Sequence, residues 1–122
     1  MTSTVQRSLK LLREAGWTCQ IVERWNAFAK VRQDLYGFGD IIACGPSGIM
    51  LVQTTSGAHV AERLAKVKAE PRAKAWYDAG GMIVVHGWAK RGPRGKAKKW
   101  EVRIEEVHFR EEKQSGNAVN PK

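Results

Sequence analysis

The stretch "DLYGFGDIIACGPSGIMLVQTTSG", residues 34–57, decides the fold, because it holds two short apolar runs on either side of a turn sequence. The runs are "DIIAC" and "IMLVQ", and the "GPSG" between them is typical of a turn between strands. We therefore expect a central hairpin whose strands are buried on both faces of a sheet. A turn centred between Pro46 and Ser47 predicts that Asp40 faces Gln53 across the two strands.

The segment before this hairpin predicts one helix and one strand. Ser3 and Gln6 have the spacing of a capping box, apolar residues follow at helical intervals, and Gly16 is suited to the helix end. Residues 17–25 are rich in strand-forming side chains, so we expect a strand there. Residues 26–39 are polar and contain two glycines, and we expect them to be irregular.

The segment after the hairpin predicts helix and then two strands. Helical spacing follows a predicted N-cap at Ser56 and is interrupted near Pro71, which indicates two short helices or one broken helix. Residues 82–88 form a third apolar run, and residues 100–104 alternate between apolar and polar. A helical connection makes "IMLVQ" and residues 82–88 parallel neighbours. The expected fold class is therefore α/β, with a mixed β-sheet flanked by helices and a C-terminal β-hairpin.

The chain length and composition predict one domain. A chain of 122 residues with 43% hydrophobic residues buries one core, which we place in residues 1–112, and residues 113–122 have the composition of a disordered tail. Cys19 and Cys44 show neither disulfide nor zinc spacing. No apolar stretch approaches the length of a membrane span and no signal-peptide pattern is present, so we expect no membrane association and a cytoplasmic protein.

The net charge of +9 favours an anionic partner such as nucleic acid, and its distribution is uneven. Residues 90–99, "KRGPRGKAKK", contain six basic residues and no acidic one, and they lie between the last two predicted strands. This segment is either a solvated loop that keeps the protein soluble or a loop that binds phosphates without reading sequence. The candidate nucleic-acid-binding residues are Lys90, Arg91, Arg94, Lys96, Lys98 and Lys99.

Asp40 needs a partner, because a carboxylate at the edge of a buried hairpin is costly unless it is paired, hydrogen-bonded or coordinated to a metal. One answer is a backbone cap, or a salt bridge to Lys30 or Arg32 in the preceding stretch. The other is an oxygen-rich cation site, because side chains alternate along a strand and Thr55 shares a sheet face with Gln53. Both answers fit the sequence.

The motif "GFGDIIA…IMLVQTTS" followed by a helix resembles the core of the PD-(D/E)XK nuclease superfamily. It is most similar to archaeal-type Holliday junction resolvases and VRR-NUC proteins, and the resemblance covers residues 3–88. It implies a restriction-endonuclease-like core with the element order αβββαβ. By this resemblance Asp40 is the motif aspartate, Gln53 takes the Glu/Gln position, Thr55 stands where lysine is usual, and Gly39 replaces the proline.

The function that this resemblance implies is hydrolysis of DNA phosphodiesters by a metal-dependent endodeoxyribonuclease, acting at branched or Holliday junction DNA as a homodimer. The metal is Mg²⁺ or Mn²⁺, which bind oxygen ligands and activate a bound water. Asp40 supplies a carboxylate, and the Gln53 side-chain oxygen and the Thr54 backbone carbonyl complete the protein's share of ligands.

Gln53 and Thr55 depart from the superfamily pattern, so other residues are needed for the missing acid and the missing lysine. Asp34 is the first candidate for the additional catalytic acid. Glu14 and Glu23 are the other acids considered, and Lys30 and Lys66 are candidates for the lysine role. The alternative function is a catalytically degenerate DNA-binding module of the same fold. A basic adaptor that docks on an acidic protein surface is a third possibility.

The basic segment generates a prediction about salt. Replacing Lys96, Lys98 and Lys99 by glutamine removes phosphate contacts, each of which contributes about 0.9 to the slope of log K against log salt concentration. DNA binding by the triple variant therefore depends less steeply on salt, as measured by fluorescence anisotropy over a salt series. An unchanged slope would exclude these lysines from the DNA interface.

Overall fold

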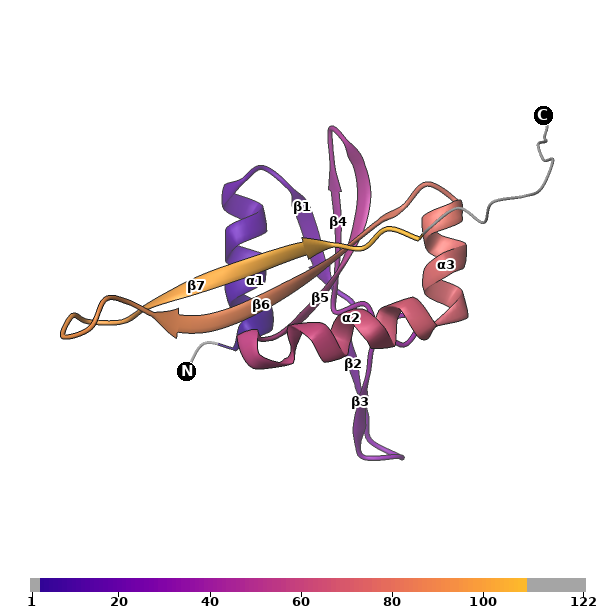
Figure 1. Cartoon of the computed structure of the whole chain (residues 1–122). Helices are drawn as coiled ribbons and strands as arrows, with labels where there is room; N and C mark the ends of the chain where they lie inside the picture. Colours follow the sequence, from indigo (N-terminus) through magenta and orange to yellow (C-terminus); the bar gives the residue numbers. More distant parts are fainter. Residues whose placement is uncertain (1–2, 110–122) are drawn as a thin grey trace, which may run out of the picture.

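The chain forms a five-stranded mixed sheet with helices on both faces (Figure 1). The computed structural model describes residues 3–109. The strands of the sheet follow the order β1-β4-β5-β6-β7, and β2 and β3 pair separately as a hairpin. The elements are α1 (Thr4–Glu14), β1 (Thr18–Ile21), β2 (Arg24–Asn26), β3 (Val31–Gln33), β4 (Ile41–Gly45), β5 (Gly48–Ser56), a 3₁₀ turn η1 (Gly57–His59), α2 (Val60–Ala69), α3 (Pro71–Asp78), β6 (Met82–Arg91) and β7 (Lys99–Glu106).

Helix α1 begins and ends where the sequence predicts. The Ser3 hydroxyl caps the helix by accepting a hydrogen bond from the Gln6 N–H at 3.2 Å. The helix ends before Gly16, whose φ of +98° reverses the chain at little steric cost. Leu9 and Leu12 are buried against the sheet, which confirms the predicted apolar face.

The central hairpin has the predicted register. Ile42 lies opposite Leu51 and Cys44 lies opposite Ile49, as a turn centred between Pro46 and Ser47 requires. Strand β5 also pairs with β6 in parallel, and helices α2 and α3 connect these two strands. Both the antiparallel register and the parallel neighbour are therefore confirmed.

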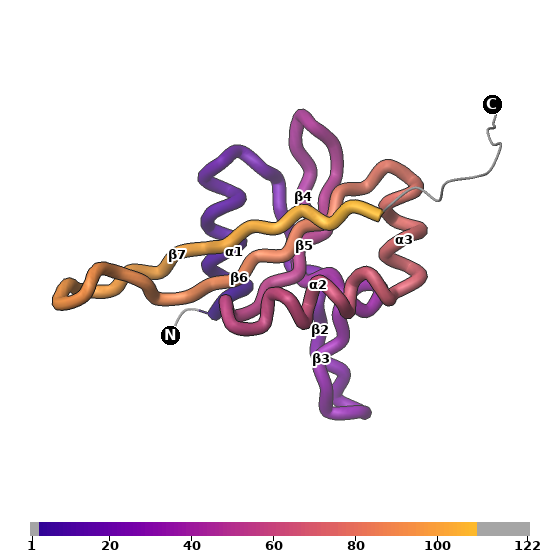
Figure 2. Tube along the Cα trace, in the orientation of Figure 1, coloured from indigo at the N-terminus to yellow at the C-terminus, as the bar shows by residue number. Residues whose placement is uncertain are grey.

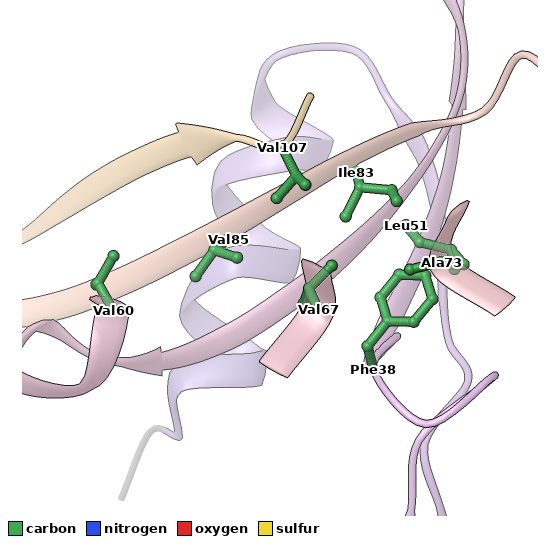
Figure 3. Close-up of a cluster of buried hydrophobic side chains, with 8 residues drawn as sticks. All are labelled: Phe38, Leu51, Val60, Val67, Ala73, Ile83, Val85 and Val107. Atoms are coloured by element: carbon green, nitrogen blue, oxygen red, sulfur yellow. The ribbon is translucent and has the colours of Figure 1, made fainter. Parts of the chain in front are cut away.

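Alternate side chains of β5 pack into two separate cores. Met50 and Val52 point toward α1 and join Leu9 and Leu12 in one cluster. Leu51 points the other way, toward α2 and α3 (Figure 3). Because both faces are covered, Met50 through Thr55 are all buried. The predicted burial of the two apolar runs fails next to the turn, where Cys44 and Ile49 are exposed. The second cluster comprises Phe38, Leu51, Val60, Val67, Ala73, Ile83, Val85 and Val107.

The prediction of one strand over residues 17–25 followed by irregular chain is wrong. Strand β1 ends at Ile21, and residues 24–33 form the β2–β3 hairpin, in which Trp25 lies opposite Arg32. The chain leaves the sheet after Val22 and Glu23, whose N–H groups both donate to the carbonyl of Asp40, at 2.9 and 3.4 Å. Figure 2 shows this hairpin projecting from the body in a different direction from the β6–β7 hairpin.

Helix α2 begins later than predicted. Ser56 is not its N-cap, because this residue still belongs to β5, where it pairs with Trp88, and the turn η1 intervenes before Val60. Gly87 lets the helix start approach the sheet closely, since a Cβ there would lie 2.2 Å from Val60 Cγ2. The predicted interruption at Pro71 is confirmed, because α3 starts at that residue.

A buried polar network joins α1 to β6. The Trp88 indole N–H donates to the Ser8 hydroxyl at 2.8 Å, and that hydroxyl is hydrogen-bonded to Nδ1 of His86, also at 2.8 Å. Burial lowers the pKa of His86 to about 4, so its imidazole is neutral near pH 7 and one of its ring nitrogens carries no proton. Trp88 is thereby fixed on the fold, where it lies opposite Val102 of β7.

The predicted tail at residues 113–122 lies outside the described residues, as do residues 110–112. Among residues 3–109, no helix combines the length and the apolar character that crossing a bilayer requires.

Replacing Ser8 by alanine is expected to destabilise the fold. The change leaves the Trp88 N–H and the His86 ring nitrogen without their shared partner, and each buried unsatisfied group costs about 1–3 kcal/mol. Urea unfolding measures the loss, and Ser47→Ala, in the exposed β4–β5 turn, is the matched control. Equal free energies of unfolding for the two variants would contradict a stabilising role for the network.

Candidate functional site

Asp40 is held in the sheet by its own backbone, although it precedes the first residue of β4. Its N–H donates to the carbonyl of Val52 at 2.8 Å, and its carbonyl accepts from the N–H of Val22 at 2.9 Å. The residue is thus fixed between β5 on one side and the end of β1 on the other. Its side chain is buried, with 3% of the residue exposed.

The side chain of Asp40 is hydrogen-bonded to β5. Its Oδ2 accepts from Gln53 Nε2 at 2.8 Å, from the Thr54 backbone N–H at 2.8 Å and from the Thr54 hydroxyl at 3.3 Å. The predicted pairing of Asp40 with Gln53 is therefore present. The backbone cap proposed for this carboxylate is also present, supplied by the Thr54 N–H. The alternative salt bridge is not, because Arg32 pairs with Glu23 at 2.9 Å and Lys30 lies exposed in the β2–β3 hairpin.

Three carboxyl groups meet beside this pair. Glu23, Asp34 and Asp40 each place one oxygen within 4.8 Å of the other two. Asp34 was the first acid expected from the sequence and Glu23 a lesser candidate, whereas Glu14 lies with Trp88 and Trp100 along α1. Glu23 directly precedes β2 and Asp34 directly follows β3, so the two ends of one hairpin deliver both acids to Asp40.

The environment strongly favours the protonated form of Asp40. Burial raises its pKa most, a hydrogen bond and repulsion from Asp34 raise it further, and Glu23 adds repulsion. The N–H of Thr54 acts in the opposite direction because it stabilises the charged form. The resulting pKa is about 8, so in the absence of a cation the carboxyl retains its proton near neutral pH.

A cavity of about 320 Å³ opens onto the carboxyl groups. Arg63 of α2 and Arg32 of β3 also border it, as do the residues at the start of α1. Two residues that line this cavity each have a buried atom without a hydrogen-bond partner within residues 3–109, namely Gln53 Oε1 and Arg63 Nε. Gln53 is only 2% exposed, so its carbonyl oxygen has lost water without gaining a donor.

The orientation of the Gln53 amide follows from its neighbours. Its NH₂ group points to the Asp40 carboxyl, and it also approaches the Thr54 carbonyl at 3.4 Å. The carbonyl oxygen of the amide, Oε1, is therefore the atom without a hydrogen-bond partner in the described chain. An oxygen in this position, next to three carboxyl groups, is a ligand that a hard cation prefers.

Not every residue selected from the sequence lies at this cavity. Thr55 sits two positions beyond Gln53, opposite Gly87, and does not line it. Two residues along a strand amount to about 7 Å, which takes Thr55 past the carboxyl groups. Neither Lys30 nor Lys66 lines the cavity. Lys66 instead borders a second cavity, of about 820 Å³, which Glu23 and Asp34 also line.

The basic segment lies elsewhere, at the tip of the long β6–β7 hairpin (Figure 1). Lys90 and Arg91 belong to the end of β6 and Lys99 to the start of β7, so half of the six basic residues are on strands rather than in a loop. All six side chains are exposed. They form a positive surface separate from the carboxyl groups.

Arg63 is the functional candidate that the sequence analysis missed. It lies three residues after Val60 and one before Leu64, on the side of α2 that faces the sheet. A basic residue on an otherwise apolar helix face was the available signal. Its position beside Gln53 depends on how α2 packs across β5, which no local pattern reveals.

Comparisons of the chain with protein-family models, with curated proteins and with solved structures found no match. The chemically active groups that line the cavity are the carboxyl groups, the Gln53 amide and two arginines.

The raised pKa of Asp40 predicts how stability depends on pH. The unfolded residue ionises near its usual 3.8, whereas the folded one holds its proton to about 8. Between these values the folded state binds more protons, so this carboxyl makes the metal-free protein less stable as pH rises, by at most about 1.4 kcal/mol per pH unit.

Asp40→Asn removes this titration. As pH rises from 5 to 8, the free energy of unfolding of the variant therefore increases relative to that of the wild type. Urea unfolding in EDTA at the two pH values measures the difference, and the contribution of His86 cancels because both proteins retain it. Asp78→Asn, at an exposed ion pair on α3, is the control. Parallel curves for wild type and Asp40→Asn would contradict the raised pKa.

Proposed function

We propose that this chain is a metal-dependent endodeoxyribonuclease that hydrolyses DNA phosphodiesters, with Mg²⁺ or Mn²⁺ held at Asp40. The observation that carries the proposal is the buried, unpartnered Gln53 Oε1 beside three carboxyl groups. Three carboxylates within 4.8 Å repel one another, and a divalent cation relieves this repulsion. The donors are all hard oxygens, which suit Mg²⁺ and Mn²⁺ rather than softer metals.

The residues that would hold the metal are Asp40, Asp34 and Glu23, with Gln53 Oε1 as the neutral ligand. When bound, such an ion lowers the pKa of a coordinated water and offsets charge on the scissile phosphate. The Thr54 backbone carbonyl, expected as a ligand, approaches the Gln53 amide instead, and the N–H and hydroxyl of Thr54 orient the Asp40 carboxyl.

Arg63 takes the place of the absent motif lysine in this proposal. Its guanidinium borders the cavity and its Nε lacks a partner within the described chain. A phosphate oxygen in the cavity is an acceptor for that N–H and is also attracted by the positive charge. Arg63 would therefore position the scissile phosphate beside the carboxyl groups.

The arrangement of the fold supports a restriction-endonuclease-like core of the PD-(D/E)XK type. The antiparallel pair β4–β5 carries Asp40 and Gln53, and β6 adds to β5 in parallel after two helices. The basic tip of the β6–β7 hairpin supplies a surface for the DNA backbone. Cutting both strands of a branched junction requires two symmetric sites, so a homodimer is part of the proposal.

A second candidate function is a DNA-binding module of the same fold without catalysis. The observation that favours it is the Gln53 amide, which replaces an acid and donates to Asp40 Oδ2, an oxygen that a metal would otherwise use. In this case the protonated Asp40 is a structural group, and the binding surface is retained.

Cleavage assays separate the two functions. With supercoiled, linear and four-way-junction DNA and Mg²⁺ or Mn²⁺, we expect cleavage by the wild type and a loss of about 100-fold or more in Asp40→Ala, because metal binding supplies several kcal/mol of transition-state stabilisation. Asp78→Asn, which changes an exposed acid on α3, is expected to retain activity.

Metal binding to the same proteins, measured by calorimetry, shows whether any loss of cleavage comes from loss of the ion. DNA binding without cleavage by the wild type, unchanged in Asp40→Ala, would support the module and overturn the nuclease.

A further inference from the structure

The β2–β3 hairpin, residues 24–33, stands away from the sheet as a separate two-stranded arm (Figure 1). Phe28 at its tip is 100% exposed, Trp25 is 61% exposed and Val31 is 48% exposed. Trp25 and Val31 point to opposite faces of the ribbon, because one pairs with Arg32 and the other with Asn26. The arm thus presents apolar side chains to water on both faces and at its end.

The tip of the arm is held in one shape. Asn26 Oδ1 accepts hydrogen bonds from the N–H groups of Phe28 and Ala29, each at 3.0 Å. The N–H of Lys30 donates to the Asn26 carbonyl at 2.7 Å, and Lys30 has a φ of +56°. A fully exposed aromatic ring on an ordered turn is costly in water, and it is already positioned for a partner.

The charge of the arm favours a polyanion over a second copy of this chain. Residues 24–33, "RWNAFAKVRQ", contain the basic residues Arg24, Lys30 and Arg32 and no acidic residue. Two such arms would repel each other, because each carries these positive charges and no negative one, so the arm is not suited to pairing with its counterpart in a second copy. A basic segment with interleaved aromatic residues is suited to nucleic-acid bases, on which aromatic rings stack regardless of sequence.

The arm also begins and ends at the candidate metal site. Glu23 directly precedes it and Asp34 directly follows it, and both carboxyl groups lie within 4.8 Å of Asp40. Phe28 lies five positions after Glu23, a reach of about 17 Å at most. DNA that contacts the tip is therefore within a few nucleotides of the carboxyl groups, since successive bases in a strand are about 3.4 Å apart.

We propose that the arm is a base-stacking element in which Phe28 stacks on unpaired bases of DNA while Arg24 and Lys30 contact the adjoining phosphates. This inference rests on the proposed function only in taking DNA as the ligand, because stacking requires neither metal nor catalysis. It predicts a preference for single-stranded or unpaired segments over fully paired duplex, whose bases are already stacked on one another.

The test uses the full chain in EDTA with a single-stranded oligonucleotide that contains 2-aminopurine, a base whose fluorescence falls when it is stacked. Phe28→Ala is expected to weaken binding by about 5- to 150-fold, the range that the loss of one stacked base produces, and to abolish the fluorescence change. Phe28→Trp retains both signals. Binding to duplex changes less in every variant.

Ile49→Ala is the matched control, because it removes another exposed apolar side chain at the β4–β5 turn, at the far end of the molecule from the arm in Figure 1. It should bind as the wild type does. Thermal unfolding verifies that Phe28→Ala remains folded, as expected for a side chain that makes no core contact.

Two results would overturn the stacking role. One is wild-type affinity and an unchanged fluorescence signal in Phe28→Ala. The other is a change from dimer to monomer in sedimentation with DNA affinity unaltered, which would make the arm a contact between copies. If Mg²⁺-dependent cleavage is absent but Phe28→Ala loses single-strand binding, the nuclease proposal fails and the arm proposal stands.

Discussion

The buried carboxyl group of Asp40 is the constraint on which the site depends. Its backbone joins β1 to β5, and its side chain binds the Gln53 amide and the Thr54 N–H. A shift of one residue in the β4–β5 register would turn Gln53 to the other face and leave the carboxyl without that partner. The same shift would bury polar groups in the apolar cluster around α1. Core packing and the polar pair therefore require the same register.

Acidic groups are gathered at one point of a basic protein. Asp40, Asp34 and Glu23 share a small volume, and only Glu23 has an ion-pair partner in the described chain, Arg32. The proton on Asp40 relieves the repulsion among these groups when no cation is present. A proton and a divalent cation are therefore alternatives at this carboxyl. In the proposed nuclease, the electrostatics that make the protein less stable as pH rises are also what favours metal binding.

The groups that we propose to contact DNA lie on two hairpins that project from the sheet (Figure 2). The β6–β7 hairpin carries the cluster of basic residues at its tip, and the β2–β3 arm carries an exposed aromatic ring. In this proposal the residues that bind DNA stand on projecting hairpins, while the carboxyl groups are held by the sheet. The arm differs from the β6–β7 hairpin because its two ends also supply carboxyl groups to the site.

The local pattern of the sequence determined the α/β class, the ends of α1, the buried β4–β5 hairpin and the pairing of Asp40 with Gln53, because a short turn relates its two flanking strands directly. The arm was missed because its side chains face water on both sides, so no apolar alternation marks its strands. Only the tertiary structure decided that Glu23 and Asp34 converge on Asp40, that Arg63 shares a cavity with Asp40 and Gln53, and that Thr55 lies beyond. These placements depend on how α2 and the ends of the arm pack against the sheet, and packing between segments distant along the chain leaves no periodic signal in sequence.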